Sequence, residues 1–268
     1  SGTPYEAEAV VRYALEAAAA GVGGLIWFDL RDDDTPAGQP GAQRGLVSRD
    51  FAPKAALLGF ASIAGHLTGA VYAGPLANTP EPFEGGLFIA GIEQIGVLLP
   101  RPGQVLPAAL FPTFDVPGAL RCEDLDRRPL PIQSTRRGDV VSTVARPMLL
   151  TLETRAPQAE PQLRLAPPWL RVPGTVFVGA DADFTLEVDQ PAQPMPRAFF
   201  QLTPPRDAAF TVSTTGTAIR GEPNETARFP IKLLPTTGGA DFERQTLTLR
   251  LSMDGDVVEL PLDVRRLS

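Results

Sequence analysis

Apolar residues recur at helical spacing near the start of the chain. They predict a helix over residues 3–20, with a buried stripe formed by Ala7, Val11, Ala14, Leu15 and Ala18. Thr3 is placed to cap this helix, Pro4 suits its first turn, and Glu6 completes a capping box. Gly21 supplies the left-handed turn that ends it. The first element is therefore expected to be an amphipathic helix.

A short apolar run follows this helix and leads to a second one. Gly24–Leu30 predicts a buried strand, and residues 31–44 predict a polar loop. The second helix is expected over residues 53–67, with an apolar face made by Leu57, Phe60, Ala61, Ala64 and Leu67. A lone strand cannot satisfy its own backbone, so residues 1–68 need neighbouring elements to cover them.

After Gly69 the pattern changes to short β-like runs separated by Pro and Gly. The first group predicts a small antiparallel sandwich: Ala70–Tyr72, Gly86–Ile92, Gln94–Leu99, Leu120–Asp124 and Val140–Leu152. A Pro-rich acidic linker follows at residues 156–161. The second group predicts an immunoglobulin-like sandwich: 163–165, 175–178, 183–188, 198–202, 209–213, 226–233, 245–253 and 257–264. Asp254-Gly255 is a hairpin-turn signal between its last two strands.

Composition supports a β-rich protein and excludes some classes of partner. The 268 residues include 29 Pro and 25 Gly, which favours many turns and few long helices. The net charge of −7 argues against a nucleic-acid partner, because phosphate binding needs a basic face. Cys122 is the only cysteine, so no disulfide can form within the chain. No run is apolar and long enough to predict a membrane span, and no metal or cofactor is expected.

One motif carries chemical information. The run Leu25–Asp34 ends in an aromatic pair and a burst of charge, and Gly45–Lys54 follows after a Gly/Pro-rich stretch. In order and spacing this resembles the eighth strand and closing helix of clan A retaining glycoside hydrolases with a (β/α)8 barrel, of the β-xylosidase-like and cellulase-like type. The matching residues are Trp27, Phe28, Asp29, Leu30, Arg31, Asp32, Asp33, Gly45, Leu46, Pro53 and Lys54. Phe28 stands where Tyr is commoner.

The resemblance implies a fold and a domain order. Residues 1–68 would be the last α-β-α unit of a TIM barrel, residues 69–155 a small β-sandwich and residues 156–268 an immunoglobulin-like β-sandwich. A β-sandwich after the barrel is usual in such enzymes. The fold class expected is therefore mixed and mainly β.

The resemblance also implies where catalysis takes place. The family uses two carboxylates about 5 Å apart, at the ends of barrel strands four and seven. Both positions would precede residue 1, so no catalytic residue is expected here and the isolated chain is expected to be inactive. Its expected partners are a saccharide substrate and the upstream barrel part of the same protein. An extracellular or cell-surface location is favoured.

Four residues are candidates for substrate binding. By resemblance, Trp27 would form the floor under the sugar, although it could also be a core residue at the top of the barrel. Asp29, Arg31 and Asp32 could hydrogen-bond sugar hydroxyls, or they could form a local ion-pair cluster that holds the loop. Outside the motif, Trp169 is expected to pack at a strand edge, although it could also be a platform for a carbohydrate.

Two functions of different class are consistent with these features. The first is the C-terminal portion of a glycoside hydrolase acting on O-glycosidic bonds; the alternative is a carbohydrate-binding or cell-surface interaction module. A third is a structural spacer that orients a catalytic domain. The barrel interpretation makes a geometric prediction: strand 24–30 should have at least one unpaired edge and expose apolar surface at Leu25–Phe28, and helix 53–67 should pack against the first sandwich.

Overall fold

The computed structural model describes residues 4–27, 29–32, 45–157, 160–179, 183–191, 198–220, 222–236, 242–253 and 255–266. Their contacts divide the chain into two compact units. Unit 1 comprises Ser1–Pro102, Phe114–Leu130 and Ala145–Arg164, and unit 2 comprises Gly103–Thr113, Pro131–Val144 and Leu165–Ser268. The two units alternate along the chain, and the expected boundaries at residues 68 and 155 remain a prediction.

Unit 1 is built on a five-stranded antiparallel sheet. Its strands lie in the order β1 (Val71–Pro75), β2 (Phe83–Ala90), β3 (Glu93–Pro100), β9 (Met148–Thr154) and β6 (Gly118–Asp124). The central strand β3 is buried along nearly its whole length. Its apolar run Ile95–Leu99 agrees with this, since a strand covered on both faces has no polar side to show.

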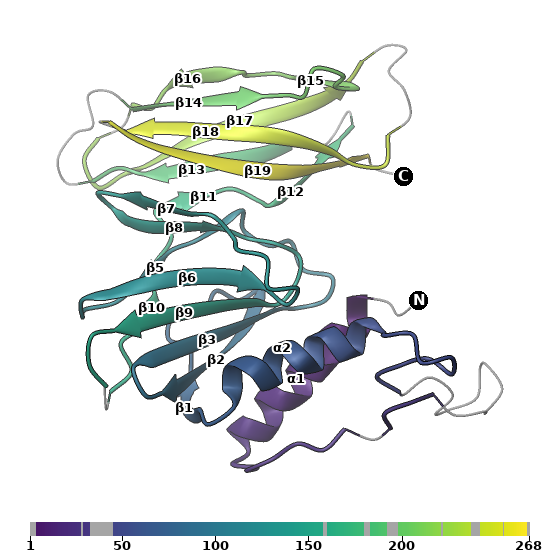
Figure 1. Ribbon diagram of the computed structural model, residues 1–268. Coiled ribbons are helices and arrows are strands. Elements are labelled where there is room, and N and C mark those ends of the chain that lie inside the picture. The colour runs from purple at the N-terminus through teal and green to yellow at the C-terminus, as the bar shows by residue number, and fades with distance from the viewer. Residues whose placement is uncertain are drawn as a thin grey trace. The chain divides into compact units, whose positions relative to one another are not determined.

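Two helices cover one face of this sheet. α1 (Pro4–Ala19) and α2 (Ala55–Leu67) lie beside each other, as Figure 1 shows. Val11 of α1 and Ile63 of α2 share a hydrophobic cluster with side chains from the sheet: Phe88, Ile95, Val97, Leu99 and Leu149. The prediction that the second helix packs against the first β module is therefore confirmed.

Gly59 explains how closely the two helices approach. A Cβ atom at Gly59 would lie 2.9 Å from the carbonyl oxygen of Ala7 and 3.0 Å from its Cα. These are backbone atoms, which cannot rotate away as a side chain can. The sequence Leu58-Gly59-Phe60 therefore provides the one small residue that the crossing of α1 and α2 requires.

The expected strand at Gly24–Leu30 is wrong for the part of it that the structure describes. Residues 24–27 and 29–30 have no regular secondary structure, and Phe28 lies outside the described residues. Leu25, Ile26 and Leu30 are exposed, Ile26 at 94%. The physical reason is that an extended segment becomes a strand only when a neighbour accepts its ladder of hydrogen bonds, and the described residues offer only short pairing with Val47. The expected exposure of apolar surface at this segment is seen at Leu25 and Ile26.

Unit 2 contains two larger sheets around one core. One has the order β11 (Leu170–Arg171), β13 (Asp183–Asp189), β17 (Thr226–Pro235) and β15 (Phe210–Val212). The other has the order β12 (Thr175–Val178), β19 (Asp256–Arg266), β18 (Gln245–Met253), β14 (Ala198–Thr203) and β16 (Gly216–Ala218). β12 and β19 pair in parallel, and the other pairs are antiparallel.

A single hydrophobic cluster joins these two sheets. Its fully buried members come from both, with Leu186 and Ile231 from the first and Phe200, Leu249 and Leu260 from the second. The alternating burial of β18 and β19 matches the alternation of Thr246–Leu251 in the sequence. Antiparallel sheets that share one core form a β-sandwich, whereas the immunoglobulin-like topology and the barrel unit remain predictions.

A smaller sheet in unit 2 corrects one expected strand. Val140–Leu152 is expected as one run, but it forms the end of β8 (Gly138–Ser142) and most of β9, with residues 143–147 between them. Pro147 has no backbone N–H for a ladder, so it separates the two. β8 pairs with β4 (Ala109–Leu110) and with β7 (Ile132–Thr135). The remaining short strands are β5 (Pro112–Thr113) and β10 (Arg164–Leu165).

Candidate functional site

The two halves of the sequence motif lie side by side in unit 1. The carbonyl of Asp29 accepts a hydrogen bond from Leu46 N–H at 3.3 Å, and the carbonyl of Leu30 accepts one from Val47 N–H at 2.9 Å. Asp32 N–H donates to the carbonyl of Val47 at 3.1 Å. These backbone bonds hold residues 29–32 against residues 46–47, although residues 33–45 separate the two segments in the sequence.

The centre of this arrangement is a buried ion pair. Lys54 Nζ donates to Asp32 Oδ1 at 3.0 Å and lies 3.4 Å from Oδ2. The side chains are only 7% and 10% exposed. The Asp32 carboxylate also accepts the N–H of Gly45 at 2.8 Å. Asp32 therefore forms a local ion pair that closes the loop between the motif halves.

Gly45 is required by this geometry. A Cβ atom there would lie 2.3 Å from the nitrogen of Asp32 and 2.4 Å from the carbonyl carbon of Arg31. Any other residue would collide with the backbone that carries the ion pair. The sequence identifies Gly45 only as part of the motif. The close approach of the Arg31–Asp32 backbone explains why this position must be a glycine.

Glu6 adds a second carboxylate that the sequence analysis did not connect with the site. Its Oε2 atom lies 4.0 Å from Lys54 Nζ, is buried and has no hydrogen-bond partner. Glu6 is expected to complete a capping box with Thr3, which lies outside the described residues. The sequence contains one signal that could have indicated this cluster. Lys54 stands immediately before the second helix, and acidic residues stand in the first helix (Glu6) and in the motif segment (Asp32).

The other three candidates belong to the same segment as Asp32. Trp27 is half-buried beside Tyr13, with ring centroids 5.9 Å apart, and it packs against the small cluster of Val10, Leu46 and Ala56. Asp29 is half-buried, and Arg31 is exposed with its guanidinium 5.2 Å from the centre of the Phe51 ring. The four candidates therefore share a segment and a loop, and their binding of substrate remains a prediction.

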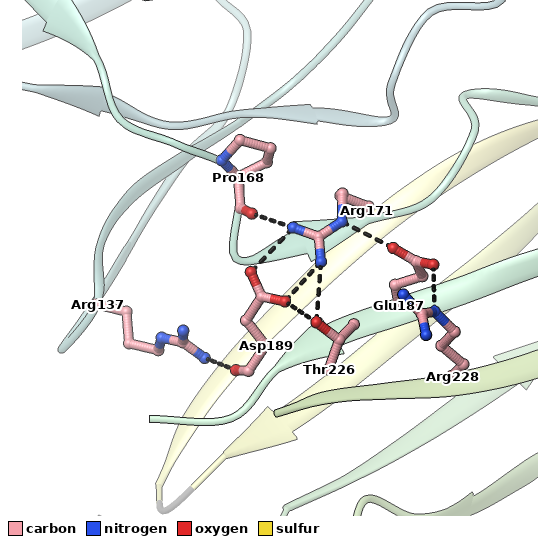
Figure 2. A network of polar contacts seen from close by, with 7 residues as sticks. All are labelled: Arg137, Pro168, Arg171, Glu187, Asp189, Thr226 and Arg228. Atoms are coloured by element: carbon pink, nitrogen blue, oxygen red, sulfur yellow. Dashed lines mark hydrogen bonds and ion pairs between the residues drawn. The ribbon is translucent and has the colours of Figure 1, made fainter. Parts of the chain in front are cut away.

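A second polar cluster lies on unit 2, where Figure 2 shows its contacts. Arg171 Nε donates to Glu187 at 2.8 Å, and the two Nη atoms of Arg171 hold both carboxylate oxygens of Asp189 at 2.9 and 2.5 Å. Thr226 Oγ1 donates to Asp189 at 2.7 Å and Arg228 Nε donates to Glu187 at 2.8 Å. The cluster bridges β11, β13 and β17, so it links three neighbouring strands.

These contacts change the acidity of the carboxylates. Hydrogen bonds from Arg171 lower the pKa of Glu187 and of Asp189 below their ordinary values. Beside them Arg137 donates to the carbonyl of Asp189 at 2.8 Å and lies over the Trp169 ring, 4.5 Å from its centre. Trp169 is buried against Phe111, in agreement with a packing role. We therefore assign this network a structural role in linking the strands, and no catalytic role.

His66, the only histidine, links α2 to β6. Its Nδ1 lies 2.7 Å from the carbonyl of Ser62, and its Nε2 makes an ion-pair contact with Glu123. Among the described residues, no group of three or more His, Cys, Asp and Glu is placed to hold a metal ion. No helix in the same part of the chain is long and apolar enough to cross a membrane.

Of the comparisons with known proteins, the one with solved structures gives matches. No family model matches the chain, and no curated protein matches it. Seven chains of solved structures match, among them a family 39 glycoside hydrolase from the gut symbiont Bacteroides cellulosilyticus WH2. That likeness has a TM-score of 0.45 and 18% identity, and it covers 55% of this chain. It covers 30% of the hydrolase, so this chain spans less than a third of that protein, and a likeness of this strength carries no argument about activity.

Proposed function

We propose that this chain is the C-terminal portion of a glycoside hydrolase that acts on O-glycosidic bonds of a saccharide. The observation that carries the proposal is the joining of the two motif halves through backbone bonds and the Asp32–Lys54 ion pair. Residues 29–32 and residues 45–47 both belong to the motif and are separated in the sequence, yet they lie against each other. A chance likeness in sequence gives no reason for this assembly.

In this proposal the segment around Trp27 contributes to a sugar site. The indole of Trp27 would lie against the apolar face of a pyranose ring, and Asp29 and Arg31 would hydrogen-bond hydroxyl groups. Asp32 would act through Lys54, by holding the segment in place. Residues 1–68 would belong to a barrel, and residues 69–155 and 156–268 would be accessory β modules.

Catalysis itself is assigned to residues outside this chain. The family's two carboxylates lie on barrel strands four and seven, before the part that the motif matches. The isolated chain is therefore expected to release no 4-nitrophenol from 4-nitrophenyl xyloside or glucoside. Turnover by the isolated chain that disappears when one of its own carboxylates is replaced would contradict this assignment.

The decisive experiment uses the product of the whole coding sequence that contains this chain. We expect it to hydrolyse an aryl glycoside, and we expect Trp27→Ala to lower kcat/KM by at least about tenfold, as loss of a stacking contact with the sugar would. Phe199→Ala, at an exposed aromatic residue of β14, is the matched control and should leave kcat/KM unchanged. A complete product without a barrel upstream would refute the proposal.

The alternative of a carbohydrate-binding module receives less support. Such modules present a row of exposed aromatic side chains, and the exposed aromatics of unit 2 in the described ranges are Phe177 and Phe199. They lie on β12 and β14, and β19 and β18 separate these strands in the sheet. Two aromatics this far apart do not make a platform for one saccharide chain.

A further inference from the structure

A hollow of about 220 Å³ lies in unit 1 between the two helices and the loops beside the sheet. Its apolar wall includes Leu58 of α2, Leu125 and Pro147, together with the small side chains of α1 and α2. Three charged groups face it, namely Glu8 of α1, Asp126 and Arg146. The hollow is separate from the Asp32–Lys54 cluster and none of its residues belongs to the motif described above.

Glu8 is the unusual member of this lining. Partial burial raises the pKa of its carboxyl, against the opposing effect of Arg12 and Arg146. Within the described part of the chain, no hydrogen bond or ion pair is formed by the Glu8 carboxylate. Arg12 and Arg146 act on it only through longer-range electrostatic attraction. Arg12 is directed elsewhere, since it forms an ion pair with Glu84. A partly buried carboxylate without a direct partner carries a desolvation cost that a bound cation would offset.

The charges of the hollow do not balance. Arg146 Nη1 donates to Asp126 Oδ2 at 3.0 Å, so these two side chains neutralise each other. Arg128 approaches the same Asp126 carboxylate at 3.9 Å but is largely exposed and does not line the hollow. The negative charge of Glu8 is therefore left over, next to apolar side chains that can cover a short aliphatic group.

We propose that this hollow binds a small organic cation, a primary ammonium group on a short aliphatic body, with Glu8 as its counter-ion. The ammonium group would donate to the Glu8 carboxylate, and the methylene groups would lie against Leu58 and Pro147. An anion is disfavoured by the unpaired carboxylate, and a neutral ligand would leave Glu8 without compensation. The ligand class follows from the residual charge and the apolar wall, and it is independent of the glycoside hydrolase proposal.

The test uses the full chain and n-butylammonium as probe, followed by amide NMR at about pH 7, where this amine is protonated like a lysine side chain. We expect saturable shifts at Glu8, Leu58 and Asp126. n-Butanol, which has the same aliphatic body without the charge, should give no saturable shifts there. Glu8→Gln should weaken binding of the cation by about fivefold, the factor of one half-exposed ion pair.

Glu16→Gln is the matched control, because Glu16 lies two turns further along α1 and outside this hollow. It should leave the affinity unchanged. Lowering the pH should weaken binding as Glu8 becomes protonated, which is a second readout that needs no variant. Equal shifts with butanol, unchanged affinity in Glu8→Gln, or no saturable shift below about 50 mM would overturn the proposal.

Discussion

The buried ion pair between Lys54 and Asp32 gives a prediction whose size can be worked out. Lys54→Met keeps the length and the apolar stem of the side chain but removes its charge. Asp32 then remains a carboxylate with a side chain only 10% exposed, and its remaining hydrogen bond comes from Gly45 N–H at 2.8 Å. Removing one partner of a buried pair costs about 3–5 kcal/mol. The Gly45 bond survives, but Glu6 Oε2 also loses the ammonium group 4.0 Å away, so we expect a loss of about 3–5 kcal/mol in the free energy of unfolding.

The measurement is urea unfolding of unit 1. Of the two tryptophans, Trp27 lies in unit 1 and Trp169 in unit 2, so Trp27 fluorescence in a Trp169→Phe background reports on unit 1. The midpoint should fall in Lys54→Met without a change in the slope against urea, since the surface exposed on unfolding stays the same.

A double variant separates the ion pair from the packing of its parts. Lys54→Met combined with Asp32→Leu removes both charges, and replacing a buried pair by apolar groups is often neutral. Gly45 N–H loses its acceptor, which costs about 1–3 kcal/mol. We therefore expect the double variant to be no less stable than Lys54→Met alone. A loss below about 1 kcal/mol in Lys54→Met, or a double variant much less stable than the single one, would refute this reasoning.

Four further predictions concern other parts of the chain. Cys122 is 3% exposed and burial raises its pKa to about 12, so a disulfide reagent should modify it in urea but hardly at all in the native protein; rapid native labelling would contradict this. Gly59→Ala should lower Tm despite its better helix propensity, because the clash with the α1 backbone costs about 1–3 kcal/mol; an unchanged Tm would mean that the helices can separate. Arg171→Met should destabilise unit 2 near neutral pH, and this loss of stability should shrink as the pH falls below about 4. The reason is that Glu187 and Asp189, whose pKa values Arg171 lowers, stabilise the fold through Arg171 only while they are ionised. A loss in urea titrations that does not depend on pH would exclude this linkage. Glu8→Gln should have the opposite sign: its raised pKa penalises the native state at neutral pH, so thermal melts should show a gain in stability that disappears in acid, and a variant less stable at every pH would contradict the burial argument.

Local sequence was sufficient for elements whose cause is local. The helix expected over residues 3–20 is found at Pro4–Ala19, and the one expected over 53–67 is found at Ala55–Leu67. Both were predicted from apolar residues at helical spacing, a property of neighbouring positions. The hairpin of β18 and β19 follows the same rule, since alternation and a turn signal suffice to predict it.

Elements that need a distant partner could not be predicted in this way. The apolar run at Gly24–Leu30 has the composition of a buried strand, but strand formation requires neighbours for its hydrogen bonds, and short pairing with Val47 is what the described residues provide. β7 was missed for a related reason. Its sequence Ile132–Thr135 is short and largely polar, and its pairing with β8 makes it a strand.

The candidate site was likewise predicted only in part from the sequence. The sequence by itself determined which residues form the motif, and it placed Trp27, Asp29, Arg31 and Asp32 close together along the chain. It left open whether Asp32 faces a ligand or a neighbouring charge. The tertiary structure decided this, because the fold brings Lys54 from the start of α2 to within 3.0 Å of Asp32 and buries both. Burial makes an unpaired charge costly, and burial is a property of the packed elements, which no local sequence pattern contains.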